Sequence, residues 1–138
     1  MMTSLWKPPV VGDILWCHFP ELPELHPGPK PRPALVVRVT VKGDGAVVAV
    51  VYGTSQRLDR LSYGELAIRK AQNPAAFALA GLSFDTKFNF KKIVELPWTD
   101  SFFKVPPKAA HGQSPKLGTL HPSMMHAARA AYLAATGG

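Results

Sequence analysis

Two polar clusters at the borders of apolar runs have the residue types that bind phosphate. Arg32 lies between two prolines just before one apolar run, and Thr54 and Ser55 follow a second one. The planar fork of a guanidinium matches phosphate oxygens, and a neighbouring hydroxyl can hydrogen-bond a phosphate oxygen or a ribose hydroxyl. These clusters predict a phosphate site. The alternative is a structural Arg32 that pairs with Asp13 or Glu65.

The two apolar runs are expected to form a hairpin that brings the clusters together. Residues 34–41 (ALVVRVTV) and 46–52 (AVVAVVY) are β-branched and apolar, and Lys42-Gly43-Asp44-Gly45 between them is typical of a turn. In an antiparallel hairpin the start of one strand lies beside the end of the other. We therefore expect Arg32 to lie near Thr54. The second run is apolar at nearly every position, which predicts a central strand covered on both faces.

The rest of the sequence predicts a scaffold of short strands. Further strands are expected at residues 11–19, 66–69, 87–96, with a bulge near Lys91-Lys92, and 116–120. A short helix is expected over 74–82, and a second helix opens at His121-Pro122-Ser123 and runs to about Ala135. Prolines make 20–33 a stiff loop, while 53–60 and 98–114 are expected to be irregular. The pattern predicts one domain over 1–138, mainly β (α+β): a small SH3-like β-barrel with a C-terminal helix.

Composition narrows the class of protein. The 138 residues carry 16 Lys and Arg against 9 Asp and Glu, a net charge of +7, which favours an anionic partner such as nucleic acid. Cys17 is the single cysteine, so an intrachain disulfide is impossible and a reducing, cytoplasmic setting is expected. No stretch is apolar and long enough to predict a membrane span. The five histidines lack zinc-site spacing, so we expect neither a metal nor another cofactor.

Several segments, taken in order, resemble one known family. They are Val11-Gly12-Asp13-Ile14-Leu15-Trp16 followed by Phe19-Pro20, then Arg32-Pro33-Ala34-Leu35-Val36-Val37, then Thr54-Ser55, and finally Lys116-Leu117-Gly118-Thr119-Leu120. Their order and spacing over roughly residues 10–135 resemble the PemK/MazF toxins of type II toxin–antitoxin systems. The barrel expected from the strand pattern agrees with the fold that this resemblance implies.

The resemblance implies a growth-inhibiting endoribonuclease that acts as a homodimer and is countered by a cognate antitoxin. Such enzymes cut single-stranded RNA without a metal and leave a 2′,3′-cyclic phosphate and a 5′-hydroxyl. Arg32 matches the arginine that stabilises the phosphorane charge and can donate a proton. Thr54 matches the threonine that orients or activates the scissile group, and Ser55 is expected to assist.

Further site residues are expected around this pair. His26 lies six residues before Arg32, where some family members carry a candidate acid–base histidine, although an exposed loop histidine is the alternative. The expected RNA-binding residues are Lys30, Ser55, Gln56, Arg57, Lys87 and Asn89. Lys87, Lys91 and Lys92, interleaved with phenylalanines, resemble a surface that stacks unpaired bases, or else lysines beside core aromatics.

The sequence departs from the family pattern at two places, and these leave other functions open. Pro27-Gly28 replaces a common Glu-Gln pair in the first loop, and Asn89 stands where a carboxylate or an amide is expected. One alternative is therefore a barrel that binds RNA or an antitoxin without cleavage. Another is an inhibitor of a topoisomerase, as in the structurally related CcdB group, although the RPALVV and TSQ segments argue against it.

Overall fold

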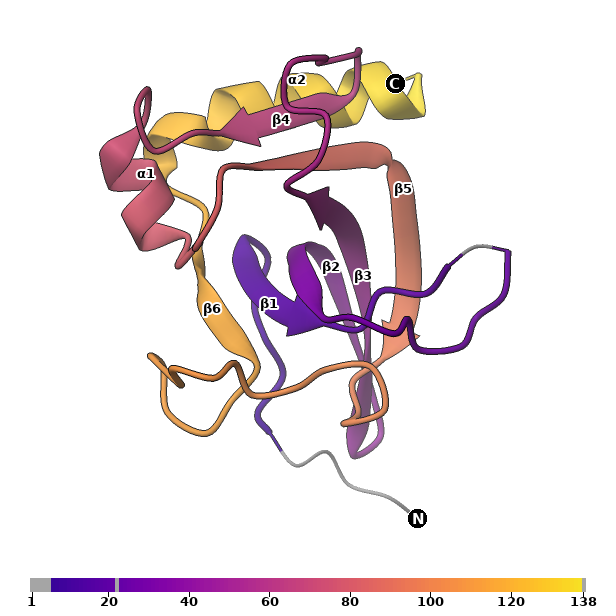
Figure 1. Cartoon of the computed structure of the whole chain (residues 1–138). Coiled ribbons are helices and arrows are strands. Elements are labelled where there is room, and N and C mark those ends of the chain that lie inside the picture. Colours follow the sequence, from indigo (N-terminus) through magenta and orange to yellow (C-terminus); the bar gives the residue numbers. More distant parts are fainter. Residues whose placement is uncertain (1–5, 22, 138) are drawn as a thin grey trace.

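The protein folds around a six-stranded antiparallel sheet that curls into a half-barrel (Figure 1). The computed structural model describes residues 6–21 and 23–137. The strands, in the spatial order β4-β5-β3-β2-β1-β6, are β1 (Asp13–Cys17), β2 (Arg32–Lys42), β3 (Gly45–Thr54), β4 (Glu65–Ile68), β5 (Thr86–Pro97) and β6 (Lys116–Thr119). The helices are α1 (Pro74–Leu79), the short 3₁₀ helix η1 (Pro122–Met124) and α2 (Met125–Thr136). The expected mainly β fold with a C-terminal helix is confirmed.

The predicted hairpin is confirmed and occupies the middle of the sheet. β2 and β3 pair antiparallel from Ala34 opposite Tyr52 to Lys42 opposite Gly45. β3 lies between β2 and β5, as expected for a strand that is apolar along its length. The hairpin reaches further than predicted, because Arg32 is the first residue of β2 and Thr54 is the last residue of β3. Both candidate residues therefore belong to the sheet and not to a loop.

Alternating side chains of β3 contribute to two separate cores. Val51 belongs to the helix-side core, which includes Phe77 of α1 and Ala128 of α2. Val50 belongs to the tryptophan-side core, which is built around Trp98. Neighbouring side chains of a strand point to opposite faces of a sheet, so β3 is buried on both. Each fully buried valine contributes about 1.5 kcal/mol or more by leaving water.

β1 follows the same alternation, as its sequence predicted. Leu15, Cys17 and Phe19 pack in the tryptophan-side core, while Ile14 packs in the helix-side core. Trp16, which shares the face of Ile14, is only partly buried. An aromatic side chain on β1 therefore remains accessible where the strand ends.

The bulge expected near Lys91-Lys92 is confirmed. Opposite β3, the register jumps from Val51 paired with Ile93 to Tyr52 paired with Asn89. The additional residues of β5 leave both lysines exposed. Figure 1 shows β5 bending sharply and reaching both the hairpin and β4. This bend brings Lys92 to the end of the hairpin.

The helices differ from the prediction in detail. α1 ends at Leu79 and not at Leu82, because Gly81 adopts a positive φ of 71° and the Leu82 N–H donates back to the Phe77 carbonyl oxygen at 3.4 Å, which closes the helix. The expected C-terminal helix is divided into η1 and α2, and His121 Nδ1 accepts a hydrogen bond from the Ser123 N–H at its start. Among the described residues, no helix has the length and apolar character needed to cross a membrane.

Candidate functional site

Arg32 and Thr54 stand at the open end of the β2–β3 hairpin. Tyr52 pairs with Ala34, and two residues further along each strand lie Thr54 and Arg32. Because strand side chains alternate, Arg32, Tyr52 and Thr54 are expected on the same face. Gly53 permits the close approach of the strands, since a Cβ there would lie 2.5 Å from the Pro33 carbonyl oxygen. The predicted proximity of the two strand ends is confirmed.

The Arg32 guanidinium lies over an aromatic ring and has no acidic partner among the residues that the structure describes. Its Cζ is 5.9 Å from the centroid of the Tyr52 ring, and Lys92 Nζ is 5.2 Å from the same centroid. Within the described part of the chain, neither cation forms an ion pair or a hydrogen bond. The ring therefore orients two cations whose hydrogen-bond donors remain available to an anion.

The carboxylates that could have paired with Arg32 have other partners. Asp13 is 3.3 Å from Lys116 Nζ, and Glu65 is 3.4 Å from Lys87 Nζ. Both carboxylates are thus neutralised by lysines. A structural ion pair between Arg32 and either residue is not formed.

Beside Tyr52 lies a cavity of about 640 Å³, here named the Tyr52 cavity. It is lined by Phe19, Pro20, Glu21, Pro29, Lys30, Arg32, Tyr52 and Lys92. Three of these side chains are cationic, and one carries a carboxylate. The excess of positive charge in a concave site favours an anionic ligand.

A second cavity of about 550 Å³, the Trp16 cavity, shares Arg32 with the first. It adjoins the helix-side core through Leu82, whereas the Tyr52 cavity adjoins the tryptophan-side core through Phe19. Its lining is mainly apolar and includes Trp16 and Phe84. Arg32 therefore stands between a cationic cavity and an apolar one.

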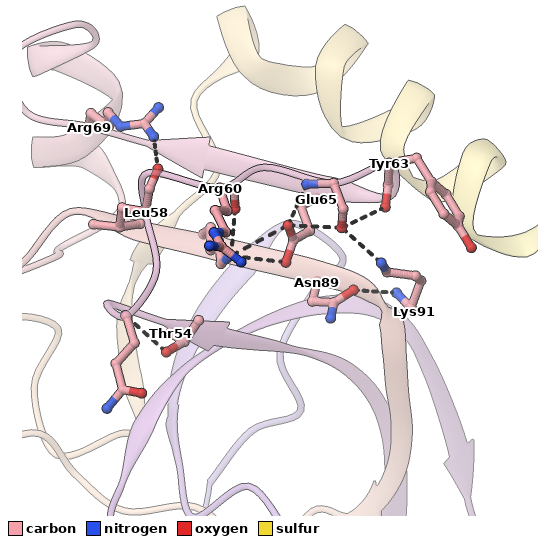
Figure 2. A network of polar contacts seen from close by, with 11 residues as sticks. Thr54, Leu58, Arg60, Tyr63, Glu65, Arg69, Asn89 and Lys91 are labelled. Atoms are coloured by element: carbon pink, nitrogen blue, oxygen red, sulfur yellow. Dashed lines mark hydrogen bonds and ion pairs between the residues drawn. The ribbon is translucent and has the colours of Figure 1, made fainter.

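Thr54 has a hydroxyl held by its own turn. Its Oγ1 accepts a hydrogen bond of 3.1 Å from the backbone N–H of Gln56 (Figure 2). An oxygen that accepts this bond keeps its own proton for donation to a ligand. Ser55 lines the Trp16 cavity, while Gln56 and Arg57 are exposed on the following loop. The structure thus places these four residues together at the end of β3.

Lys87 differs from the surface cation that the sequence predicted. Only 9% of its side chain is exposed, and its ammonium group donates to the Arg60 carbonyl oxygen at 2.8 Å. It also pairs with Glu65, whose carboxylate accepts hydrogen bonds from the Ser62 N–H and hydroxyl. Figure 2 shows this network above the end of β3. Lys87 therefore braces the loop between β3 and β4 and offers no free charge to RNA.

The environment of Glu65 favours its charged form. Burial on its own raises the pKa of a carboxyl group, but hydrogen bonds from Ser62 and the charge of Lys87 together lower the pKa of Glu65 below 4.5. The carboxylate is therefore ionised at neutral pH and holds Lys87 in place.

Asn89 lies near the hairpin but outside both cavities. Its Oδ1 accepts a hydrogen bond of 3.0 Å from the Lys91 N–H, within the bulge of β5. Its backbone pairs with Tyr52 on one side and with Glu65 on the other. Asn89 thus stabilises the bulge that positions Lys92.

His26 is not brought to Arg32. Its side chain is 84% exposed, lies 3.9 Å from Glu24 and lines neither cavity. The loop that carries it is held by a hydrogen bond between His18 Nδ1 and the Gly28 carbonyl oxygen at 2.8 Å. A Cβ on Gly28 would lie 2.2 Å from the Phe19 carbonyl oxygen, so glycine is required there. The departure at Pro27-Gly28 therefore has a structural reason in this chain.

Sequence reasoning missed several residues of the two cavities. Glu21 is the carboxylate of the Tyr52 cavity, and Lys108 and Phe84 line the Trp16 cavity. The only available signal for Glu21 was its place in the loop before Arg32. Phe84 and Lys108 come from distant segments, and no local sequence pattern predicts that they line a cavity together with Arg32.

Neither a reactive cysteine nor a metal site is present among the described residues. Cys17 is fully buried, and burial raises the pKa of its thiol, so it is not an activated nucleophile. No cluster of three or more metal-ligating His, Cys, Asp or Glu side chains is found in residues 6–21 and 23–137.

Comparison with known proteins adds no relative. A scan against protein-family models and a search of curated proteins find no match. The resemblance to PemK/MazF toxins therefore depends on the ordered segments of the sequence alone.

Proposed function

We propose that this protein is a PemK/MazF-like endoribonuclease that cuts single-stranded RNA. In this proposal the half-barrel sheet belongs to a small SH3-like barrel, and the protein acts in the cytoplasm as a homodimer that an antitoxin restrains. The proposal is supported by the ordered segments that resemble the family and by the charge of the chain. It requires no metal or other cofactor.

The observation that carries the proposal is the guanidinium of Arg32, which lies between two cavities and pairs with no carboxylate of residues 6–21 and 23–137. With Lys30 and Lys92, it supplies three cations to the Tyr52 cavity, where they can contact successive phosphates of one strand. An RNA strand fits this arrangement better than a single nucleotide, because the two cavities provide neighbouring places for adjacent nucleotides. Base stacking on aromatic side chains favours an unpaired strand over a duplex.

The chemistry is an attack of the ribose 2′-oxygen on the adjacent phosphorus. The new bond joins the 2′-oxygen to phosphorus, and the bond from phosphorus to the 5′-oxygen breaks. The 2′-hydroxyl proton passes to Glu21, the carboxylate of the Tyr52 cavity. A solvent water gives a proton to the leaving 5′-oxygen, and the proton that Glu21 then releases neutralises the resulting hydroxide. The products are a 2′,3′-cyclic phosphate and a 5′-hydroxyl, and no water is consumed.

Arg32 and Thr54 have distinct roles in this step. The guanidinium fork of Arg32 stabilises the additional negative charge on the phosphorane oxygens, which is worth about 10²–10³ in rate for one such donor. The Thr54 hydroxyl keeps its proton for hydrogen bonding to a phosphate oxygen or to the 2′-oxygen. His26 lies outside the reacting groups in this proposal.

The test is cleavage of long single-stranded RNA in excess EDTA by the wild type and by Arg32→Ala and Thr54→Ala. Arg38→Ala is the matched control, because Arg38 lies on the same strand and pairs with Glu95 at 3.2 Å, away from both cavities. We expect discrete fragments with cyclic phosphate ends from the wild type and from Arg38→Ala. Arg32→Ala is expected to be about 10²–10³ slower.

Binding without cleavage is a second candidate function. The observation that favours it is that no histidine lines either cavity among the described residues. Of the described lining residues, Glu21 is then the one candidate base, and a carboxylate is a weaker base at neutral pH than an imidazole. This function predicts that the folded wild type retains RNA in a filter-binding assay and yields no new ends. Fragments that depend on Arg32 would contradict it.

A further inference from the structure

The Trp16 cavity has the shape and lining of a small-molecule site. Its volume of about 550 Å³ falls in the usual range for a ligand pocket. Its walls come from β1, the start of β2, the end of β3, β6, and the segments 81–86 and 106–110. None of the described residues that line it is acidic, and Arg32 and Lys108 supply positive charge. The cavity thus fits an apolar group that is attached to an anion.

The aromatic residues of the cavity indicate what that apolar group is. Trp16 is partly buried in the wall, and Phe84 is 70% exposed to solvent. The loop around Phe84 is held by the Thr86 hydroxyl, which donates to the Phe84 carbonyl oxygen at 2.7 Å. A large aromatic side chain held in water beside a cavity is suited to stack on a flat ring.

Polar groups at the rim fit the edge of such a ring. Ser55 and Ser83 line the cavity, and their hydroxyls form no hydrogen bond within the part of the chain that the structure describes. A hydroxyl both donates and accepts, so it can bond the donors and acceptors on the edge of a nucleobase. Aromatic faces and free hydroxyls together match a base better than they match an aliphatic side chain.

We propose that the Trp16 cavity is a nucleobase subsite that selects the base next to the phosphate bound by Arg32. The inference rests on the proposed function, because Arg32 lines both cavities and fixes the distance from phosphate to base. Phe84 and Trp16 stack on the base, and Ser55 and Ser83 contact its edge. The cavity is then a specificity determinant, while the Tyr52 cavity binds the backbone of any sequence.

The experiment measures the binding of short RNA that cannot be cleaved, because each ribose at the cut site lacks its 2′-hydroxyl. A set of hexanucleotides carries one abasic position, moved along the strand. The proteins are the wild type, Phe84→Ala and the matched control Tyr63→Ala. Tyr63 is an aromatic residue that is 69% exposed and lines neither cavity. Loss of either exposed ring should leave the fold intact, which thermal unfolding will verify.

We expect Phe84→Ala to weaken binding of the intact hexanucleotide about ten-fold, in line with one stacked base. One abasic position should weaken binding to the wild type by a similar factor, and it should have no further effect on Phe84→Ala. Tyr63→Ala should behave as the wild type does. The cut positions in long RNA should also become less selective in Phe84→Ala.

Three results would overturn the inference. If Phe84→Ala and Tyr63→Ala bind alike while the wild type cleaves RNA, the base subsite fails and the proposed function stands. If Phe84→Ala alters only self-association, seen by sedimentation, the cavity serves a second copy of the chain. If the wild type neither binds nor cleaves any RNA, both the subsite and the proposed function fail.

Discussion

Lys87 and Arg32 are basic residues near the end of β3 with opposite environments. Lys87 of β5 is buried, pairs with Glu65 and donates to the Arg60 carbonyl oxygen. Arg32 of β2 is partly exposed, lies over Tyr52 and has no acidic partner among the described residues. Both were expected to contact RNA.

The difference teaches that a partner, and not charge alone, decides what a cation does. A buried lysine whose charge is compensated holds protein segments together, and its removal leaves an unpaired carboxylate. A cation without an acidic partner keeps its donors for an external anion. In this molecule, Lys87 braces the loop between β3 and β4, while Arg32 is available between two cavities.

The largest effect is expected from breaking the buried pair. Lys87→Met leaves Glu65 with only 8% of its side chain exposed and no counter-charge, so we expect the free energy of unfolding to fall by about 3–5 kcal/mol. Urea denaturation followed by circular dichroism measures this change. Arg38→Ala, which breaks an exposed pair, should cost about 1 kcal/mol or less.

A double variant sharpens this test. Lys87→Met with Glu65→Leu removes both charges and should recover much of the lost stability, because an apolar pair of similar volume can replace a buried ion pair. If Lys87→Met were as stable as the wild type, the contrast between the two cations would be wrong.

The next largest effect is expected on the cleavage rate, from Glu21, which lines the Tyr52 cavity together with Arg32. Glu21→Gln keeps the size of the side chain but cannot accept a proton, so we expect cleavage to slow by about 10²–10⁴ with unchanged stability. Glu24→Gln is the matched control, because Glu24 is on the same loop and lines neither cavity. Equal rates for the wild type and Glu21→Gln would exclude Glu21 as the base.

A smaller effect is expected on the stability of the fold when the pH is lowered. The pKa of Glu65 is lowered in the folded chain, so its charged form stabilises the fold above its ordinary value of 4.5. That contribution disappears as the pH falls through the lowered pKa, because the unfolded chain takes up the proton first. Urea midpoints measured between about pH 6 and pH 3 should show this fall in the wild type.

Two variants separate Glu65 from the other carboxylates. Glu65→Gln should lose part of the pH dependence of stability, while Glu95→Gln, at an exposed pair, should keep it. An identical pH profile for Glu65→Gln and the wild type would contradict the role assigned to the buried pair.

The smallest effect is expected at His26. Because this side chain is exposed and lines neither cavity, His26→Ala should leave the cleavage rate within about two-fold of the wild type, as is usual for a surface change. The rate is measured on the same long RNA across neutral pH. A cleavage rate ten-fold or more below that of the wild type would show that His26 takes part in catalysis.

The fold could be predicted where the physical cause is local. Alternation along β1 assigned its residues to two faces, and β-branched runs around a Gly/Asp turn predicted the central hairpin. The two adjacent lysines in an otherwise alternating strand predicted the bulge of β5. The end of α1 was predicted three residues too late, although Gly81, which adopts the positive φ typical of a residue just after a helix, is a stop signal in the sequence.

The candidate site could be predicted only in part. The strand ends that carry Arg32 and Thr54 lie together because strand pairing follows from the sequence pattern, whereas the partner of Lys87 comes from β4, 22 residues away. Closeness in sequence did not guarantee a place at the site either. His26 lies six residues before Arg32 and lines neither cavity. Cavity walls assembled from distant segments require the folded chain.

Chemical rescue of Arg32→Ala tests the central claim most directly. Guanidinium chloride at millimolar concentrations is added to the variant during cleavage of single-stranded RNA, with sodium chloride at equal ionic strength as the control. If Arg32 supplies an unpaired guanidinium to the phosphate, cleavage should return in proportion to guanidinium, and the ends should remain cyclic phosphates. Full cleavage by Arg32→Ala without guanidinium, or equal recovery with sodium chloride, would contradict the account.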